Sequence, residues 1–103
     1  MAYKSQVSGM RERDIEAYLR DRVKTLGGRA YKFVSPGNAG VPDRLVLLPG
    51  GRVVFVELKA PGRKPTPLQL AQHQRLRALG CDVRVIDSLE QVDELLAGYR
   101  EER

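Results

Sequence analysis

Residues 41–59 read VPDRLVLLPGGRVVFVELK, two apolar runs separated by Pro49-Gly50-Gly51. Runs rich in β-branched residues on either side of a short glycine-containing turn are typical of a β-hairpin. This pattern predicts strands over residues 44–48 and 52–57. Because Val53-Val54-Phe55-Val56 is apolar at successive positions, both faces of the second strand should be covered. The second strand is therefore expected to be central in the sheet and covered on both sides.

The chain around this hairpin contains a first helix and two further strands. Residues 11–26 place their apolar side chains on one helical face, and Gly27-Gly28 ends the pattern. Residues 30–34 and 82–86 are short apolar runs of the kind found in strands. The segment from Ser35 to Gly40 is rich in proline and glycine, which predicts a loop.

Two capping boxes predict the remaining helices. Thr66-Pro67-Leu68-Gln69 combines an N-cap, a proline at the first helical position and a capping glutamine. The helix that it opens should run to about Leu79. Ser88-Leu89-Glu90-Gln91 repeats the pattern and should open a short helix to about Ala97. The predicted order of elements is αβββαβα.

The size and composition are those of one small globular domain. With 103 residues, the chain should form a single domain over residues 10–97, with a flexible segment 1–9 and a frayed tail 98–103. No apolar run approaches the ~18 residues of a membrane span, so we expect no membrane association and a cytoplasmic location. The net charge of +5 favours a polyanionic partner.

Acidic and basic side chains are expected to meet at one end of the hairpin. Side chains alternate faces along a strand, so Glu57 and Lys59 should point the same way, with the Leu58 carbonyl between them. Asp43 begins the neighbouring strand and should lie close to Glu57. Two carboxylates and a carbonyl oxygen suit a hard cation such as Mg²⁺ or Mn²⁺. The chain has no cluster of histidines or cysteines, which disfavours zinc.

A third carboxylate is expected from the first helix. At ~100° per residue, Glu12 lies closer than Glu16 to the centre of the apolar stripe. A glutamate near a buried face needs a partner, so Glu12 is assigned to the metal site. Glu16 is the alternative, and it can equally be a residue at the boundary of the stripe.

This set of residues predicts metal-dependent hydrolysis of a phosphodiester. The reaction builds negative charge on phosphoryl and leaving oxygens, and one or two divalent ions neutralise it and activate a water. Lys59 would orient that water and stabilise the transition state. Each motif alone has a simpler interpretation, since an Asp after a proline is often a turn residue and an exposed Glu-x-Lys pair is worth less than ~1 kcal/mol. Their combination on consecutive strands favours the catalytic interpretation.

Gln69 has both a structural and a functional interpretation. It completes the capping box with Thr66, and the helical period places it on the inner side with Leu76. Its side chain can therefore serve the backbone as well as a metal-bound water or a phosphate. His73 lies one turn further on and is predicted at the surface; one histidine with no Asp or Ser partner makes no catalytic triad.

Basic and polar residues around the site are candidates for contact with DNA. Together the basic ones can follow a phosphate backbone with salt-sensitive affinity, although each alone is typical of a solvated charge. The loop from Ser35 to Gly40 is interpreted as a flexible rim beside Asp43 that lets DNA approach. It lacks the Lys-Ser/Thr of a P-loop, so no nucleotide cofactor is expected. The candidate contacts are Lys32, Ser35, Asn38, Arg44, Arg63 and Lys64.

In combination, these motifs resemble the VRR-Nuc group, which comprises stand-alone, virus-type nucleases of the PD-(D/E)XK superfamily. The resemblance covers most of the chain, from Met10 to about Leu96. It also includes stretches similar to phage and bacterial members, Lys32-Phe33-Val34-Ser35-Pro36-Gly37 and Leu48-Pro49-Gly50-Gly51-Arg52. The motifs that carry it are Gly40-Val41-Pro42-Asp43, Glu57-Leu58-Lys59 and Thr66-Pro67-Leu68-Gln69, after a helix with Glu12 and Glu16.

The resemblance implies an α/β fold with a restriction-endonuclease-like core, αβββαβ(α), in which helices flank a mixed central sheet. It also implies Mg²⁺ or Mn²⁺ as cofactor and branched DNA, such as Holliday junctions or flaps, as substrate in replication, repair or recombination. Small members of the group tend to be homodimers. By position, the metal ligands would be Glu12, Asp43, Glu57 and the Leu58 backbone carbonyl, and the catalytic residues would be Lys59 and the helix glutamine Gln69.

Three functions remain after this step. A divalent-metal-dependent DNA endonuclease is favoured, and a non-catalytic nucleic-acid-binding module on the same fold is the alternative. An RNA endonuclease that uses the 2′-OH is the weakest, because it needs a base such as His73. Junction or flap preference, and one or two metal ions, are left open.

Overall fold

The computed structural model describes residues 9–101, so the predicted flexible segment 1–9 lies, apart from Gly9, outside the described residues. The order αβββαβα is confirmed. No helix in this range is both long enough and apolar enough to cross a membrane. The elements are α1 (Glu12–Thr25), β1 (Arg29–Lys32), β2 (Arg44–Leu48), β3 (Arg52–Leu58), α2 (Pro67–Ala78), β4 (Asp82–Ile86) and α3 (Leu89–Glu101).

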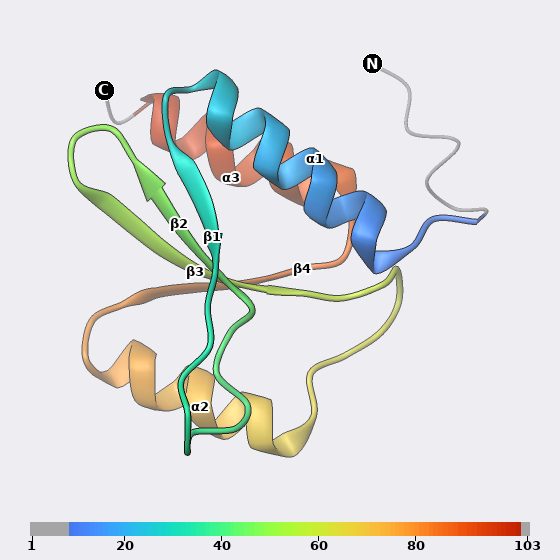
Figure 1. The fold of residues 1–103 in the computed structure, drawn as a ribbon, viewed down its shortest axis with the longest axis vertical. Helices are drawn as coiled ribbons and strands as arrows, with labels where there is room; N and C mark the ends of the chain where they lie inside the picture. The colour runs from blue at the N-terminus through green and yellow to red at the C-terminus, as the bar shows by residue number, and fades with distance from the viewer. Residues whose placement is uncertain (1–8, 102–103) are drawn as a thin grey trace.

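The strands form one mixed sheet in the order β1-β2-β3-β4. The β1–β2 and β2–β3 pairs are antiparallel, whereas β4 runs parallel to β3 because α2 carries the chain back across the sheet. Figure 1 shows α1 and α3 together on one side of the sheet and α2 on the other. The hairpin strand β3 is therefore central, as its apolar run predicted.

The main hydrophobic core lies between the sheet and the α1–α3 pair. Alternate side chains of β3 point into it, so Val54, Val56 and Leu58 are buried while Val53 is exposed. From α1, the predicted apolar stripe is buried at Ile15, Leu19 and Val23. The other core residues come from β2, β4 and α3 and are Val46, Leu48, Ile86, Val92, Leu95, Leu96 and Tyr99.

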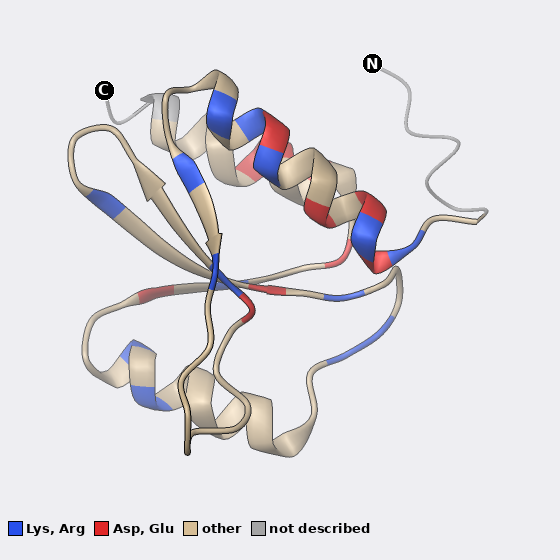
Figure 2. Ribbon diagram, viewed as in Figure 1, with Lys and Arg blue, Asp and Glu red and all other residues tan. Residues whose placement is uncertain are grey.

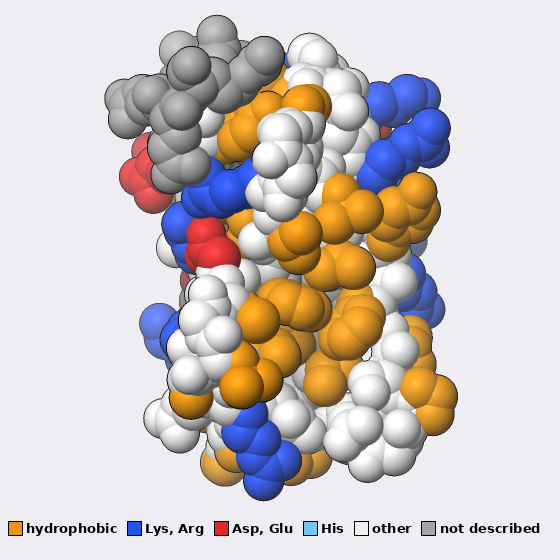
Figure 3. All heavy atoms as spheres, turned by 90° about the vertical axis from the view of Figure 1, so that its left-hand side faces the viewer, with side chains coloured by type: hydrophobic (Ala, Val, Ile, Leu, Met, Phe, Trp, Pro, Cys, Tyr) orange, Lys and Arg blue, Asp and Glu red, His pale blue; other side chains and the backbone are white. Residues whose placement is uncertain are grey.

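The opposite face of the sheet is only partly covered, because α2 packs chiefly against β4. The strand register places five apolar side chains of β1, β2 and β3 on this face, and Tyr31 and Val53 among them are 52% and 43% exposed. Apolar side chains form a continuous band here in the space-filling view (Figure 3). We call this surface the open apolar face; it consists of Tyr31, Leu45, Leu47, Val53 and Phe55.

The hairpin turn sets the register that matters for the site. Gly50 and Gly51 adopt φ angles of +89° and +82°, which a residue with a Cβ rarely adopts. They close the turn so that Leu48 pairs with Arg52, and every pair up to Arg44 and Val56 follows from this alignment. A slip by one residue would turn each side chain to the other face.

The predicted end of the last helix near Ala97 is wrong, and of the predicted frayed tail 98–103 residues 102 and 103 lie outside the described residues. The helix α3 continues to Glu101, and Tyr99 is only 3% exposed. The Tyr99 hydroxyl donates a hydrogen bond to the Pro49 carbonyl at 3.0 Å. Tyr99 continues the helical spacing of Val92, Leu95 and Leu96, and this apolar face outweighs the helix-breaking tendency of Gly98.

Candidate active site

Asp43 and Glu57 meet across the β2–β3 hairpin. Arg44 pairs with Val56, so Asp43, just before Arg44, and Glu57, just after Val56, lie at the same end and on the same face of the sheet. The Oδ2 atom of Asp43 accepts a hydrogen bond from the Leu58 amide at 2.7 Å. Asp43 is thus attached to β3 beside Glu57, where the hairpin predicted it.

Glu57 is 1% exposed, and three side chains surround its carboxylate. Lys59 Nζ lies 3.7 Å from Oε2, and Gln69 Nε2 donates a hydrogen bond to the same oxygen at 3.2 Å. His73 Nε2 lies 3.5 Å from Oε1. Leu58 packs in the core on the other side of the sheet. The predicted alternation is confirmed, with Glu57 and Lys59 on one face.

The electrostatics of this pair favour a bound proton or cation. Burial, and after it the negative charge of Asp43, raises the pKa of Glu57 to about 7, while Lys59 acts in the opposite direction. Two carboxylates in a poorly solvated place repel one another unless positive charge is added between them. Their donor atoms are all oxygen, which fits a hard divalent cation such as Mg²⁺ or Mn²⁺.

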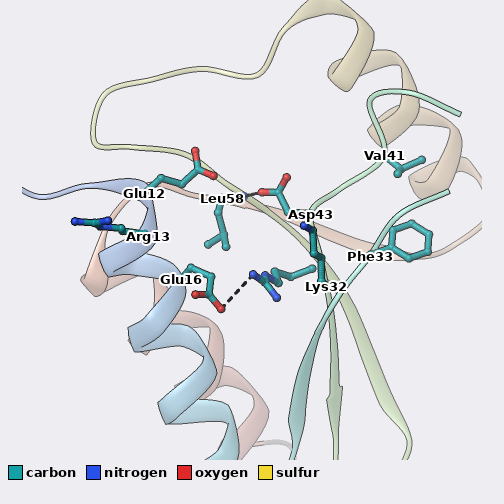
Figure 4. A pocket seen from close by; sticks show the side chains of 9 residues that line it. Glu12, Arg13, Glu16, Lys32, Phe33, Val41, Asp43 and Leu58 are labelled. Atoms are coloured by element: carbon teal, nitrogen blue, oxygen red, sulfur yellow. Dashed lines mark hydrogen bonds and ion pairs between the residues drawn. The ribbon is translucent and has the colours of Figure 1, made fainter. Parts of the chain in front are cut away.

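The two glutamates of α1 have different surroundings (Figure 4). Glu16 forms ion pairs with Arg20 at 3.1 Å and with Arg44 at 3.3 Å. Burial and the nearby charge of Asp43 raise the pKa of Glu12, and the charge of Lys59 lowers it. Glu12 therefore interacts electrostatically with Asp43 and Lys59, whereas the charge of Glu16 is balanced by Arg20 and Arg44. The geometry favours Glu12 over Glu16 as the helix carboxylate.

These carboxylates stop short of a complete ligand set. Among the described residues, no three His, Cys, Asp or Glu side chains form a group that could hold a metal. Asp43 and Glu57 are adjacent, and Glu12 lines the same hollow as Asp43. Mg²⁺ commonly keeps several waters and takes only one or two protein carboxylates together with substrate phosphate. The Asp43–Glu57 pair fits this kind of site, with Glu12 across the hollow.

Gln69 uses both ends of its amide. Its Oε1 accepts a hydrogen bond from the Thr66 amide at 2.9 Å, and its own backbone amide donates to Thr66 Oγ1 at 3.2 Å. This is the predicted capping box. Its Nε2 donates to Glu57, so the side chain that begins α2 also holds a site carboxylate. The inward orientation predicted for Gln69 is confirmed.

Comparisons with known proteins agree with this geometry. No family model matches the chain. The chain is 62% identical over 79 residues to "Putative nuclease p44" of Acyrthosiphon pisum secondary endosymbiont phage 1. The aligned residues cover 77% of this chain and 85% of that protein. A solved structure of a VRR_NUC domain superposes with a TM-score of 0.80 at 42% identity, covering 85% of this chain and 96% of the other.

The chain belongs to the VRR-Nuc family of nucleases. The expected restriction-endonuclease-like fold, a mixed sheet with flanking helices, is thereby confirmed. The motif residues of a VRR-Nuc nuclease occur here on elements that converge: Asp43 before β2, Glu57 and Lys59 at the end of β3, and Gln69 in the first turn of α2.

Two hollows adjoin the carboxylates of this VRR-Nuc domain, and Glu12 lines both. The first has a volume of about 350 Å³ and includes Lys32 and Arg44. The second has about 500 Å³ and includes Lys59, Arg63 and Lys64. Figure 2 shows basic segments beside the acidic ones where β1, β2 and β3 cross, and along the loop from β3 to α2. Arg13, which also lines the first hollow, was not predicted from the sequence.

The loop between β1 and β2 is tied down more firmly than a flexible rim would be. Asn38 donates from its side chain to Ser35 Oγ and from its backbone to the Ser35 carbonyl, both at 3.0 Å. Gln72 Nε2 of α2 donates to the Ala39 carbonyl at 3.1 Å. Ser35 and Asn38 line neither hollow. Their contact with DNA stays a prediction.

The predicted surface position of His73 is wrong. Its side chain is fully buried and faces Glu57. Gln69 and His73 are four residues apart on α2 and therefore lie on one face of the helix. The inward orientation of Gln69 already implied the same for His73, so the sequence contained this signal.

Proposed function

We propose that this VRR-Nuc nuclease is a divalent-metal-dependent DNA endonuclease that hydrolyses phosphodiester bonds. The observation that carries the proposal is the buried Glu57 carboxylate beside Asp43, with the Lys59 ammonium 3.7 Å away. Such a pair is unfavourable without added positive charge, and a divalent cation at this place supplies it. Asp43, Glu57 and the Leu58 carbonyl would hold Mg²⁺ or Mn²⁺, with Glu12 from α1.

The residues around the carboxylates then have separate tasks. When bound, the cation neutralises charge on the phosphate and lowers the pKa of the attacking water. Lys59 brings its ammonium group to the same side of β3, where it orients the water and stabilises developing negative charge. Gln69 restrains Glu57 through its hydrogen bond to Oε2. The Leu58 amide restrains Asp43 in the same way.

The basic residues that line the two hollows support DNA as the substrate. Lys32 and Arg44 lie at one side of the carboxylates, and Arg63 and Lys64 lie at the other. A phosphate backbone that follows both hollows would pass the Asp43–Glu57 pair. Because this attraction is electrostatic, binding should weaken as the salt concentration rises. With DNA as substrate, we propose the cytoplasm of a bacterial or phage-infected cell as the place of action.

A substrate panel tests this proposal. Linear, flapped and four-way-junction DNA are incubated with Mg²⁺, Mn²⁺ or EDTA, and the products are separated on a denaturing gel. We expect cut strands with either metal and none with EDTA. The variant Lys59→Met should lower the rate by about 10²-fold or more, in the range of a lost proton-transfer or charge-stabilising group. Lys24→Met, at an exposed position of α1, is the matched control and should cleave normally.

The same panel separates the alternatives. Salt-sensitive binding that ignores EDTA and yields no cut ends would assign the chain to non-catalytic nucleic-acid binding. Cleavage of RNA alone without metal would require a histidine base. His73 is fully buried, so its imidazole is not available to a bound substrate. We propose branched DNA, junction or flap, as the preferred substrate because of the family resemblance, and the relative rates across the panel decide between them.

We further propose that two copies associate, so that two active sites act on two strands of one branched substrate. The open apolar face supports this proposal, because monomeric soluble proteins rarely leave a contiguous apolar patch uncovered. Phe55 on this face stacks edge-on against Phe33 at 5.5 Å between ring centroids. A second copy is the occupant that gives symmetry and two cuts.

Light scattering after size exclusion tests the association. We expect twice the chain mass of 11.5 kDa for the unmodified protein. Val53→Asp, which places a charge at an exposed position of the open apolar face next to the hairpin turn, should shift the mass to that of one chain. Leu70→Asp, a similarly exposed leucine on α2, is the control and should remain associated. A single-chain mass for the unmodified protein would contradict the proposal.

A further inference from the structure

We propose that His73 is a positioning residue: its Nε2–H donates to Glu57 Oε1 and thereby fixes the orientation of the carboxylate toward the metal and Lys59. The inference rests on the proposed function. It concerns the one histidine of the chain, which the sequence placed at the surface and the structure places against a site carboxylate. His73 does not touch the substrate and acts only through Glu57.

The first argument is the division of the Glu57 carboxylate between its neighbours. Oε2 receives the Gln69 hydrogen bond and lies near Lys59, while His73 Nε2 lies 3.5 Å from Oε1. Gln69 and His73 stand one turn apart on the same face of α2. One helix thus presents a donor to each oxygen of one carboxylate. A donor to each oxygen would restrain rotation of the carboxylate more than one donor alone does.

The second argument is energetic. Among the described residues, neither nitrogen of His73 nor Glu57 Oε1 has a hydrogen-bond partner of good geometry. A buried polar group without a partner destabilises the fold, so an apolar side chain would be favoured at this place if His73 had no polar role. Nε2 and Oε1 are two of these three atoms and lie 3.5 Å apart, so one hydrogen bond between them would satisfy both. The burial of His73 is thus explained by a contact with Glu57.

The third argument concerns the form of the imidazole. A neutral imidazole carries a single N–H, and the ring nitrogen that faces Glu57 Oε1 is Nε2. With that proton on Nε2, the ring is a directed donor to Glu57 and adds no positive charge that would compete with a cation. Groups that hydrogen-bond a metal-binding carboxylate typically change metal affinity by about 10–100-fold when removed.

Two substitutions test the role. His73→Leu removes the donor at similar volume, whereas His73→Gln can place an amide nitrogen near the Nε2 position. We measure Mn²⁺ binding by calorimetry, and kcat and KM for cleavage. His73→Leu should weaken Mn²⁺ binding about 10–100-fold and lower kcat at limiting metal, with KM for DNA unchanged. His73→Gln should recover most of the loss. Gln74→Leu, on the exposed side of α2, is the control.

A measurement on the unmodified protein keeps the test decisive if His73→Leu does not fold. Because the chain has one histidine, its ¹⁵N imidazole spectrum is unambiguous. We expect the Nε2–H tautomer, with a shift of that signal in Glu57→Gln. An Nδ1–H tautomer, or equal Mn²⁺ affinity in the leucine and unmodified proteins, would overturn the assignment. Absence of Mn²⁺ binding in the unmodified protein would instead contradict the proposed function, while the tautomer still reports on the His73–Glu57 contact.

Discussion

Replacing Asp43 with asparagine is expected to slow DNA cleavage by at least about 10³-fold while the fold is retained. Charge stabilisation by a bound metal is worth several kcal/mol in the transition state, and each ~1.4 kcal/mol is a factor of ten in rate. The asparagine is isosteric, and its carbonyl oxygen can still accept the hydrogen bond of the Leu58 amide. The variant therefore removes one negative charge and little else.

The stability of Asp43→Asn should change in the opposite direction to its activity. The charge of Asp43 is one cause of the raised pKa of Glu57, so its removal relieves repulsion in the metal-free protein. In EDTA, the melting temperature should be equal to or higher than that of the unmodified protein. Asp21→Asn, at an exposed position of α1, is the control and should keep full activity. Cleavage by Asp43→Asn at the normal rate would remove Asp43 from the mechanism.

The hairpin explains why so much of this site was predictable from the sequence. A three-residue connection fixes the pairing of Leu48 with Arg52. The strand register and the alternation of side chains then place Asp43 beside Glu57 on the same face. The same period puts Lys59 with Glu57 and Leu58 in the core. These relations are local in the chain, so residue spacing determines them.

The features that were not predictable depend on contacts between distant segments. Glu12 and Glu16 both lie on α1 beside its apolar stripe, and the choice between them depends on Arg44 of β2, which forms an ion pair with Glu16. The end of α3 depends on Tyr99 reaching Pro49 at the hairpin turn. His73 is an intermediate case, because its burial follows from the helical spacing of Gln69 but its partner Glu57 lies on another element.

The open apolar face shows a different limit of sequence patterns. The continuous apolar run of β3 predicted cover on both faces of the strand, and α1 and α3 provide it on one side. On the other side α2 reaches β4 and the end of β3, where Glu57 lies, but leaves Val53 43% exposed. A strand pattern records that a face is apolar, and it does not distinguish cover within the chain from cover by a second copy.

The second large effect is a pH dependence of stability that the metal should suppress. In EDTA, the unfolding free energy should fall by about 3 kcal/mol between pH 4.5 and pH 7.5, because each pKa unit corresponds to ~1.4 kcal/mol. The pKa of Glu57 rises from 4.5 to about 7 on folding, so the folded state binds the proton more tightly. This stabilisation is complete below pH 4.5 and is lost as the pH rises through 7. Urea unfolding at a series of pH values measures it.

Two comparisons assign this dependence to the site. Glu57→Gln carries no titrating proton, so its stability should be nearly constant over the same pH range and should exceed that of the unmodified protein at pH 7.5. Saturating Mg²⁺ should raise the unfolding free energy of the unmodified protein at pH 7.5, since a ligand that binds only the folded state stabilises it by mass action. An unchanged slope in Glu57→Gln would show that another group titrates. The Asp43–Glu57 pair would thus lower the stability of the metal-free protein and raise that of the metal-bound protein. Binding of the cation would explain why the chain keeps two carboxylates at a poorly solvated place.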